Sequence, residues 1–96
     1  MALTGKQRHH LRALAHHLDP LVRLGKEGVS EGVLSALDIA LEKHELVKVK
    51  LADTEDREEV GASLAKSSGA QVAQVIGRIV LVYRPRKKDP KIRLPR

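Results

Sequence analysis

One short motif in this sequence has the residue types that suit a phosphate group: Gly25-Lys26-Glu27-Gly28. Glycines let the backbone approach a phosphate without interference from a Cβ atom, and Lys26 adds a positive charge. The motif follows an apolar run and precedes Ser30, a residue type that caps helices, so a helix would offer its backbone N–H groups beside it. We therefore predict a phosphate-binding loop at residues 25–28, with an ordinary turn as the alternative interpretation of the same pattern.

The other reactive residue types form no catalytic or metal-binding pattern. The sequence has no cysteine, which excludes disulfides, thiol nucleophiles and Cys-ligated metals. Four of its five histidines are close in sequence: His9, His10, His16 and His17. No two are four residues apart, the spacing that places two imidazoles on one metal, so they are interpreted as surface residues. The alternative is that they strengthen the binding of an anionic partner as the pH falls. The carboxylates of residues 53–59 fit a solvated helix start rather than a calcium loop. We predict no enzyme activity, no cofactor and no metal site.

The charge of the chain is unevenly distributed. The net charge is +6 and the isoelectric point is about 10.0. Residues 1–24 carry four Lys and Arg and one acid, residues 25–69 carry six and ten, and residues 70–96 carry eight and one. This separation predicts a basic surface formed by the two ends of the chain, for which nucleic acid is the first partner to consider. Tyr83 is the only aromatic residue, so binding by base stacking on aromatic platforms is nearly excluded.

Hydrophobic periodicity predicts the elements that position these residues, in the order α-β-α-β-α-β-β. We expect helices over residues 4–18, 30–44 and 55–68, and strands over residues 21–24, 46–52, 72–76 and 79–84. Gly77 and Arg78 separate the last two strands and favour an antiparallel type II′ hairpin. Right-handed crossovers place the second and third helices on one face of a four-stranded mixed sheet, in a two-layer α/β fold. The other face stays free or is partly covered by the first helix.

The same periodicity places basic residues on two exposed faces. Arg8 and Arg12 lie with His9 and His16 on the outer side of the first helix. Lys48 and Lys50 lie on the water-facing side of the predicted strand 46–52, either as an ordinary solvated face or as RNA contacts. By contrast, acidic residues line the outer side of the second helix, which should repel phosphate.

The chain ends in the sequence RPRKKDPKIRLPR, which contains three of its four prolines. Proline excludes regular secondary structure, and the clustered cations repel one another. We therefore expect one domain at residues 1–84 and a basic tail at residues 85–96 that is mobile when unbound. Cations of this segment suit phosphate contact. No stretch is apolar enough to span a membrane, and we expect a cytoplasmic protein.

Five segments resemble one known family: LTGKQRHHLRALAH, PLVRLGKEGVSEGV, ALEKHELVKVKL, QVIGRIVLVYRP and KIRLPR. They are similar to the bacterial YhbY proteins, single-domain members of the CRM (chloroplast RNA splicing and ribosome maturation) family. The resemblance implies a fold similar to the C-terminal domain of translation initiation factor three, RNA binding without catalysis, and association with precursors of the large ribosomal subunit. The GxxG loop of the family corresponds to residues 25–28, where Glu27 is unusual. Residues 52–70 match least.

Together these observations predict an RNA-binding ribosome-assembly factor. It would bind precursor ribosomal RNA through Gly25, Lys26, Glu27 and Gly28, and cations elsewhere would add contacts: Arg8, Arg12, Arg78, Arg84, Arg86, Lys87 and Lys88. We expect a monomer, with ribosomal proteins as possible further partners. The alternative function is a protein-interaction module that reaches the ribosome through a protein, using the acidic side of the second helix or the strands at residues 72–82. A DNA-binding protein is a third alternative.

Overall fold

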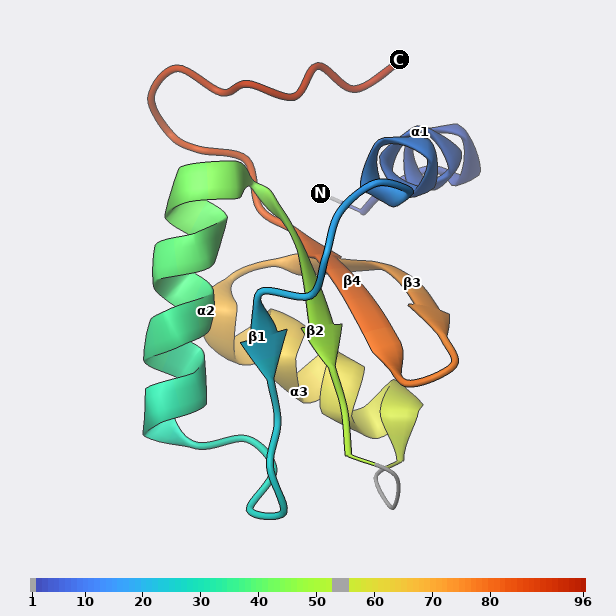
Figure 1. The fold of residues 1–96 in the computed structure, drawn as a ribbon. Helices are drawn as coiled ribbons and strands as arrows, with labels where there is room; N and C mark the ends of the chain where they lie inside the picture. The colour runs from blue at the N-terminus through green and yellow to red at the C-terminus, as the bar shows by residue number, and fades with distance from the viewer. Residues whose placement is uncertain (1, 53–55) are drawn as a thin grey trace.

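The structure is a computed structural model, and it describes residues 2–52 and 56–96. Its elements follow the predicted order: α1 (Gly5–Ala15), β1 (Val22–Arg23), α2 (Glu31–His44), β2 (Leu46–Lys50), α3 (Arg57–Ser68), β3 (Gln71–Ile76) and β4 (Ile79–Tyr83) (Figure 1). The capping residues explain where the helices begin. Thr4 accepts a hydrogen bond from the Gln7 backbone in a capping box, and Ser30 and Asp56 cap α2 and α3 through side-chain oxygens that accept backbone N–H groups.

The four strands form one mixed sheet in the order β1-β2-β4-β3. β1 is parallel to β2, and β4 is antiparallel to both of its neighbours. Gly77 takes a positive φ of 57° and Arg78 does not, which agrees with a type II′ turn between β3 and β4. In the register of β2 and β4, Leu46 faces Tyr83 at one end of the sheet and Lys50 faces Ile79 at the other. The predicted mixed sheet is therefore confirmed.

A hydrophobic core lies on each face of the sheet. α2 and α3 cover one face, as expected, and α1 covers part of the other (Figure 1). The first core consists of Val22, Leu24, Leu37, Leu41, Val47, Val49, Leu51, Leu64, Val80 and Val82. The second consists of Leu3, Leu11, Ala15, Leu46, Ala73, Leu81 and Tyr83. Each fully buried Leu or Val side chain stabilises the fold by about 1.5–3 kcal/mol.

Gly61 lies inside α3, where glycine is usually unfavourable, and packing explains its presence. A Cβ atom at this position would lie 3.3 Å from a methyl group of Val80 and 3.8 Å from one of Val72. Glycine therefore allows the helix to approach the sheet closely, and this contact offsets the conformational entropy that glycine costs.

Some element boundaries differ from the prediction. α1 ends at Ala15 rather than residue 18, and two apolar residues of the predicted helix, Leu14 and Leu18, are 43% and 40% exposed. β1 has only two residues and β2 ends at Lys50, after which the Leu51 N–H donates to the Arg78 carbonyl. The predicted helix start at residue 55, and the carboxylates of Asp53 and Glu55, lie outside the described residues. None of the helices in the two described ranges is long and apolar enough to cross a bilayer.

The C-terminal tail, residues 85–96, is docked on the domain rather than mobile, so that expectation is wrong. Its anchor is Glu45, which follows α2 with a φ of 65° and is fully buried. The Glu45 carboxylate accepts hydrogen bonds from the backbone N–H groups of Arg86, Lys91 and Ile92, at 2.8, 2.6 and 2.9 Å. Ile92 and Leu94 pack against the second core. As predicted, the tail contains no helix or strand.

The environment of Glu45 has opposing effects on its pKa. Burial raises the pKa, but the three backbone hydrogen bonds and the positive charge of Arg86 lower it, and the net pKa lies below the ordinary value. The carboxylate is therefore charged at neutral pH and holds the tail in that form. Burial, together with the negative charge of Glu45, raises the pKa of the neighbouring Tyr83.

Candidate nucleic-acid interface

The predicted phosphate loop, residues 25–28, is a tight turn on the surface. The Gly28 N–H donates to the Gly25 carbonyl at 3.1 Å, and Gly28 has a φ of 71°, a conformation that favours glycine. Gly25 does not need a positive φ, and a Cβ atom added to it would meet nothing within 4 Å. Lys26 and Glu27, at the corner of the turn, are both exposed. The loop is therefore accessible to a phosphate.

The electrostatics of this loop are mixed. α2 begins three residues after Gly28, and the Ser30 side chain already accepts the Val33 N–H at 3.2 Å. Glu27 follows Lys26, the single cation of the motif, and Glu31 is in the first turn of α2. The negative charge of both residues interacts favourably with the positive N-terminal end of the α2 dipole, but it repels a bound phosphate. The loop needs cations from other elements to bind RNA.

Arg23, Lys48 and Lys50 supply such cations on the α1 side of the sheet, and we call these three residues the basic sheet face. Val47 and Val49 of β2 point into the core under α2 and α3, so the alternating Lys48 and Lys50 point to the opposite side. Arg23 is the register partner of Lys50 on β1. Neighbouring strands are about 4.8 Å apart, so these two side chains are adjacent. A single residue separates Arg23 from the loop.

Helix α1 adds further cations beside the basic sheet face. It carries Lys6, Arg8 and Arg12 and no acidic residue, and both arginines are exposed. Arg12 lies 3.4 Å from a ring nitrogen of His9 and lines a groove that Lys48 also lines. The Lys48 ammonium donates to the Leu18 carbonyl at 2.8 Å, which fixes the lysine close to the segment that follows α1.

Arg78 lies at the same end of the sheet as the loop. Its carbonyl accepts the Leu51 N–H at 2.7 Å, and the Leu24 N–H donates to the neighbouring Lys50 carbonyl at 2.9 Å. Leu24 is the residue immediately before Gly25. Arg78 is exposed in the β3–β4 turn and remains a candidate contact.

The tail begins at the opposite end of the sheet, so the tail cations that we predicted as RNA contacts do not lie around the loop. β1 leads into the loop at the Lys50 end, whereas β4 leads into the tail at the Leu46 end. Figure 1 shows the loop below the sheet and the tail above it. The tail cations Arg86, Lys87 and Lys88 therefore lie away from the loop, and the Arg86 guanidinium donates to the Asp89 carbonyl at 2.9 Å.

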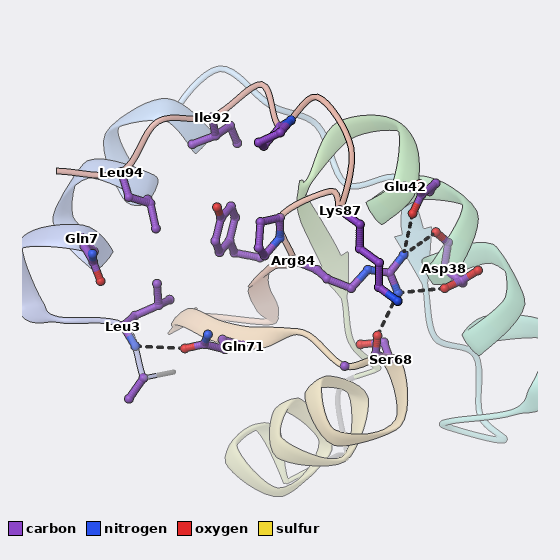
Figure 2. Close-up of a pocket in the computed structure, with 15 residues that line it drawn as sticks. Leu3, Gln7, Asp38, Glu42, Ser68, Gln71, Arg84, Lys87, Ile92 and Leu94 are labelled. Carbon is purple, nitrogen blue, oxygen red and sulfur yellow. Dashed lines mark hydrogen bonds and ion pairs between the residues drawn. The ribbon is translucent and has the colours of Figure 1, made fainter. Parts of the chain in front are cut away.

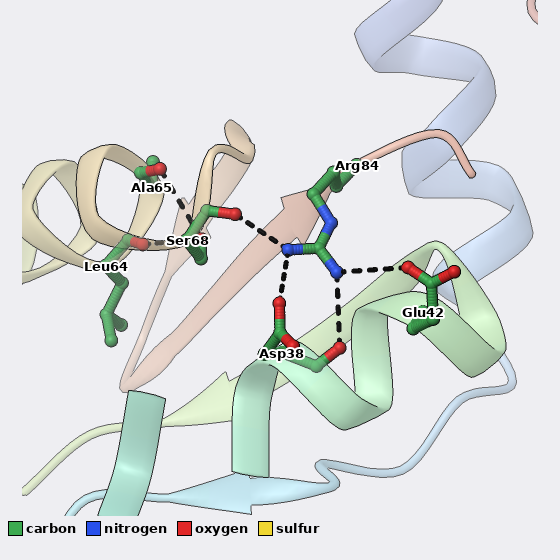
Figure 3. Close-up of polar contacts among 6 residues, drawn as sticks. All are labelled: Asp38, Glu42, Leu64, Ala65, Ser68 and Arg84. Carbon is green, nitrogen blue, oxygen red and sulfur yellow. Dashed lines mark hydrogen bonds and ion pairs between the residues drawn. The ribbon is translucent and has the colours of Figure 1, made fainter. Parts of the chain in front are cut away.

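Arg84 has a structural role that differs from the predicted RNA contact. Its guanidinium lies 2.8 Å from the Asp38 carboxylate, 3.5 Å from Glu42 and 2.8 Å from the Ser68 carbonyl (Figure 3). Only 19% of the Arg84 side chain is exposed. The residue joins β4 to α2 and to the end of α3, and these acceptors occupy the donors that a phosphate would need.

A cavity of about 930 Å³ lies beneath the tail (Figure 2). Leu3, Ile92 and Leu94 form its apolar part, whereas Asp38 and Glu42 lie with Arg84 at its polar end. Because Lys87 also lines this end, two carboxylates are balanced by two cations, and the cavity has no net positive charge to attract a phosphate. Within the described ranges, no three His, Asp or Glu side chains converge on a position that could hold a metal ion.

Sequence reasoning missed two roles. Arg23 is turned away from the apolar run in the predicted strand, but only its register with Lys50 shows that it lies beside the loop. Glu45 entered the prediction only as one acid of the middle segment. The signal for the docked tail was the pair of apolar residues, Ile92 and Leu94, inside an otherwise charged and proline-rich stretch.

Comparisons with known proteins find one domain family and relatives that are named as RNA-binding proteins. Residues 3–84 match the model of the CRS1 / YhbY (CRM) domain. A Haemophilus influenzae protein named as an RNA-binding protein is 44% identical, over 98% of this chain and 96% of its own length. The Bacillus subtilis protein YqeI, named a probable RNA-binding protein, is 40% identical, over 97% and 99%. A solution structure of a Staphylococcus aureus protein, described as a candidate RNA-binding protein, has a TM-score of 0.86 and 38% identity, over 98% and 100% of the two chains.

Proposed function

We propose that this chain, which belongs to the CRS1 / YhbY (CRM) domain family, binds RNA through the basic sheet face, helix α1 and the loop at residues 25–28. The relatives named as RNA-binding proteins support RNA as the ligand. One observation carries the location: Arg12, Lys48, Lys50 and Arg23 follow one another across a single face of the molecule and lead to the loop. The binding face lacks acidic residues along α1, β1 and β2.

The affinity in this proposal comes mainly from the RNA backbone. The single tyrosine, Tyr83, is 4% exposed and belongs to the second core, so it offers no stacking surface. Lysine and arginine side chains that neutralise phosphates release counterions, and this term dominates sequence-independent binding. The loop contributes a turn that a phosphate can approach closely, and Arg78 and Lys26 add charge at its edge.

Within this proposal, the biological target is structured ribosomal RNA in precursors of the large subunit. This target follows from the resemblance to the YhbY proteins, whose quoted segments extend over nearly the whole chain. The protein would act in the cytoplasm as a monomeric binding factor without catalysis, and ribosomal proteins near the bound RNA would be secondary contacts. Crosslinking in cells, with the crosslinked RNA mapped to single residues, tests this target, and crosslinks confined to other RNAs would contradict it.

The direct test of the interface uses two double variants with the same change in charge. Arg23→Glu with Lys50→Glu alters the proposed site, and Lys87→Glu with Lys88→Glu alters the tail. Binding to a single-stranded RNA is measured over a range of salt concentrations. The first variant should lower the salt slope by about 0.7 for each phosphate that it no longer neutralises, and the second should leave it near the wild-type value. An equal reduction in both variants would show that only net charge matters.

The alternative of a protein-interaction module has less support. Most apolar side chains of residues 72–82 lie in the two cores, and Asp38 and Glu42 of α2 face Arg84. A pull-down repeated after nuclease treatment separates the two functions, because partners that survive removal of the RNA favour the protein-interaction module. Competition between duplex DNA and structured RNA tests the third alternative, DNA binding.

A further inference from the structure

A groove of about 500 Å³ lies between α1 and the sheet, next to the basic sheet face. One wall is formed by His9 and Arg12 of α1 and by His16, the residue that follows the helix. Lys48 of β2 and Gln74 of β3 lie on the sheet side. Ile76, Ile79 and Leu81 provide an apolar floor, and Ile76 is 60% exposed. The groove therefore combines a hydrophobic surface with two cations, Arg12 and Lys48, and none of the described side chains that line it is acidic.

The packing of α1 explains why this space is open. Leu11 and Ala15 are buried against the end of the sheet where Leu46 faces Tyr83. The other end of the β3–β4 hairpin, with Ile76 and Ile79, extends beyond this contact. Ala13 and Ala15 line the groove from the helix, and their short side chains leave its interior unfilled.

These walls match the parts of a nucleotide. The Arg12 guanidinium and the His9 imidazole, 3.4 Å apart at their closest nitrogens, are planar groups on which a base can stack. Gln74 carries both a donor and an acceptor for the edge of a base. An ammonium group has three donors, and the Leu18 carbonyl uses one of those of Lys48, so phosphate contact is compatible with that bond. The apolar floor fits the face of a base.

We infer that this groove binds one unpaired nucleotide of the RNA, with the base between the apolar floor and the planar side chains of Arg12 and His9, and the phosphate toward Lys48. The inference rests on the proposed RNA-binding function and adds a structural preference to it. A base inside an A-form helix is stacked on both faces and paired along its edge, so only a bulged, looped or single-stranded nucleotide can enter. Contacts to phosphates alone would not create such a preference. The volume lies within the range of about 300–1,000 Å³ that is usual for ligand pockets.

The experiment compares two RNA hairpins that differ only by a one-nucleotide bulge, with 2-aminopurine as the bulged base. Affinities for both hairpins are measured at fixed salt, and the fluorescence of the bulged base is followed on binding. The wild-type protein should prefer the bulged hairpin and change the fluorescence of its base. Arg12→Lys keeps the charge but removes the planar group, and it should reduce the preference by about tenfold, as for removal of one stacking side chain.

A second variant and a control make the experiment specific. Gln74→Leu keeps the size of the side chain but removes its hydrogen bonds, and it should reduce the preference by about threefold to fivefold. Arg93→Lys makes the same chemical change as Arg12→Lys on the exposed tail and should leave the preference unchanged. Thermal unfolding of each variant shows whether it is folded.

The outcomes for the groove and for the proposed function are distinct. If the wild-type protein binds both hairpins equally, or if neither groove variant alters the preference, the groove does not hold a nucleotide, while salt-dependent RNA binding through the basic sheet face stands. If the wild-type protein binds neither hairpin at any salt concentration, the proposed function fails and the groove inference fails with it.

Discussion

The two faces of the sheet differ in charge although they share the same strands. On one side, α1 carries three Lys and Arg and no acid, and it leaves Arg23, Lys48 and Lys50 uncovered. On the other side, α2 carries Glu31, Asp38 and Glu42 against one lysine. α3 carries Glu58 and Glu59 against Arg57 and Lys66, so the acidic excess of this layer comes from α2. The molecule therefore separates its charge by layer. Chain position is a poorer guide, because two cations of the basic side, Lys48 and Lys50, come from the acidic middle of the sequence.

Two charged residues, Arg84 and Glu45, each contact the layer of opposite charge. Arg84, from the basic C-terminal segment, points into the acidic layer and contacts Asp38. Glu45, from the end of the acidic helix, holds the backbone of the tail whose apolar residues pack on the α1 side. Both contribute to the fold. The cations that remain on the α1 side, Arg12, Arg23, Lys48 and Lys50, are among those that we propose for RNA.

The largest effect on stability should come from Glu45→Gln, which tests the contact between the Glu45 carboxylate and the backbone of the tail. The amide keeps one acceptor oxygen but places an NH₂ group among three backbone donors, and it loses the charge that strengthens those bonds. We expect a decrease of about 2–3 kcal/mol in the free energy of unfolding, measured by urea titration. Glu42→Gln, the same change at an exposed position of α2, is the control and should alter stability by less than about 0.5 kcal/mol. Equal effects in both variants would show that the buried carboxylate contributes no more to stability than an exposed one.

The second prediction compares the two layers directly. Lys50→Glu, on the basic sheet face, should weaken binding to single-stranded RNA by about tenfold, because it removes a phosphate contact and adds a repulsive charge, and it should lower the salt slope by about 0.7. Lys66→Glu changes the net charge equally but lies on the exposed side of α3. Its affinity should stay within about twofold of wild type, since screening limits the effect of a distant exposed charge. Equal weakening would mean that the layers are not functionally different.

Much of the fold could be predicted because local signals determine it. Thr4 and Ser30 are capping residues, Lys48 and Lys50 alternate with buried valines, and Gly77 starts the turn between the last two strands. The position of the tail relative to the loop was also implied by these signals. When the last strand is antiparallel to the first, the two strands end at opposite ends of the sheet. A loop after the first strand and a tail after the last therefore lie at opposite ends.

Other features depend on contacts between distant parts of the chain and left little trace in the sequence. The partners of Glu45 lie more than 40 residues away, and they are backbone groups, which carry no residue-type signal. The same holds for the bond from Arg84 to the Ser68 carbonyl. The groove beside α1 depends on how far one helix extends over a sheet, and the predicted helix end was three residues too late.

A smaller effect on stability is expected for Arg84→Met, which tests the contact between Arg84 and the acidic residues of α2. Methionine keeps much of the apolar stem but cannot form the bonds to Asp38, Glu42 and Ser68. Because both carboxylates are largely exposed, water replaces the guanidinium as their partner, and we expect a decrease of about 1 kcal/mol in the free energy of unfolding. RNA affinity of the folded variant should equal that of wild type. Clearly weaker RNA binding would indicate that Arg84 contacts RNA, as the sequence pattern predicts.

The last prediction concerns the dependence of stability on pH, which Glu45 affects only in the acid range. The pKa of Glu45 in the folded protein lies below its ordinary value of 4.5, which is close to the value in the unfolded chain. The charged form is thus favoured by folding, so its contribution is fully present above the unfolded pKa and is lost as the pH falls through the folded pKa. Between pH 6 and 3, wild-type stability should therefore fall more steeply than that of Glu45→Gln, and the backbone amides of Lys91 and Ile92 should lose protection from hydrogen exchange. Parallel pH profiles for the two proteins would show that the tail is held mainly by the apolar contacts of Ile92 and Leu94.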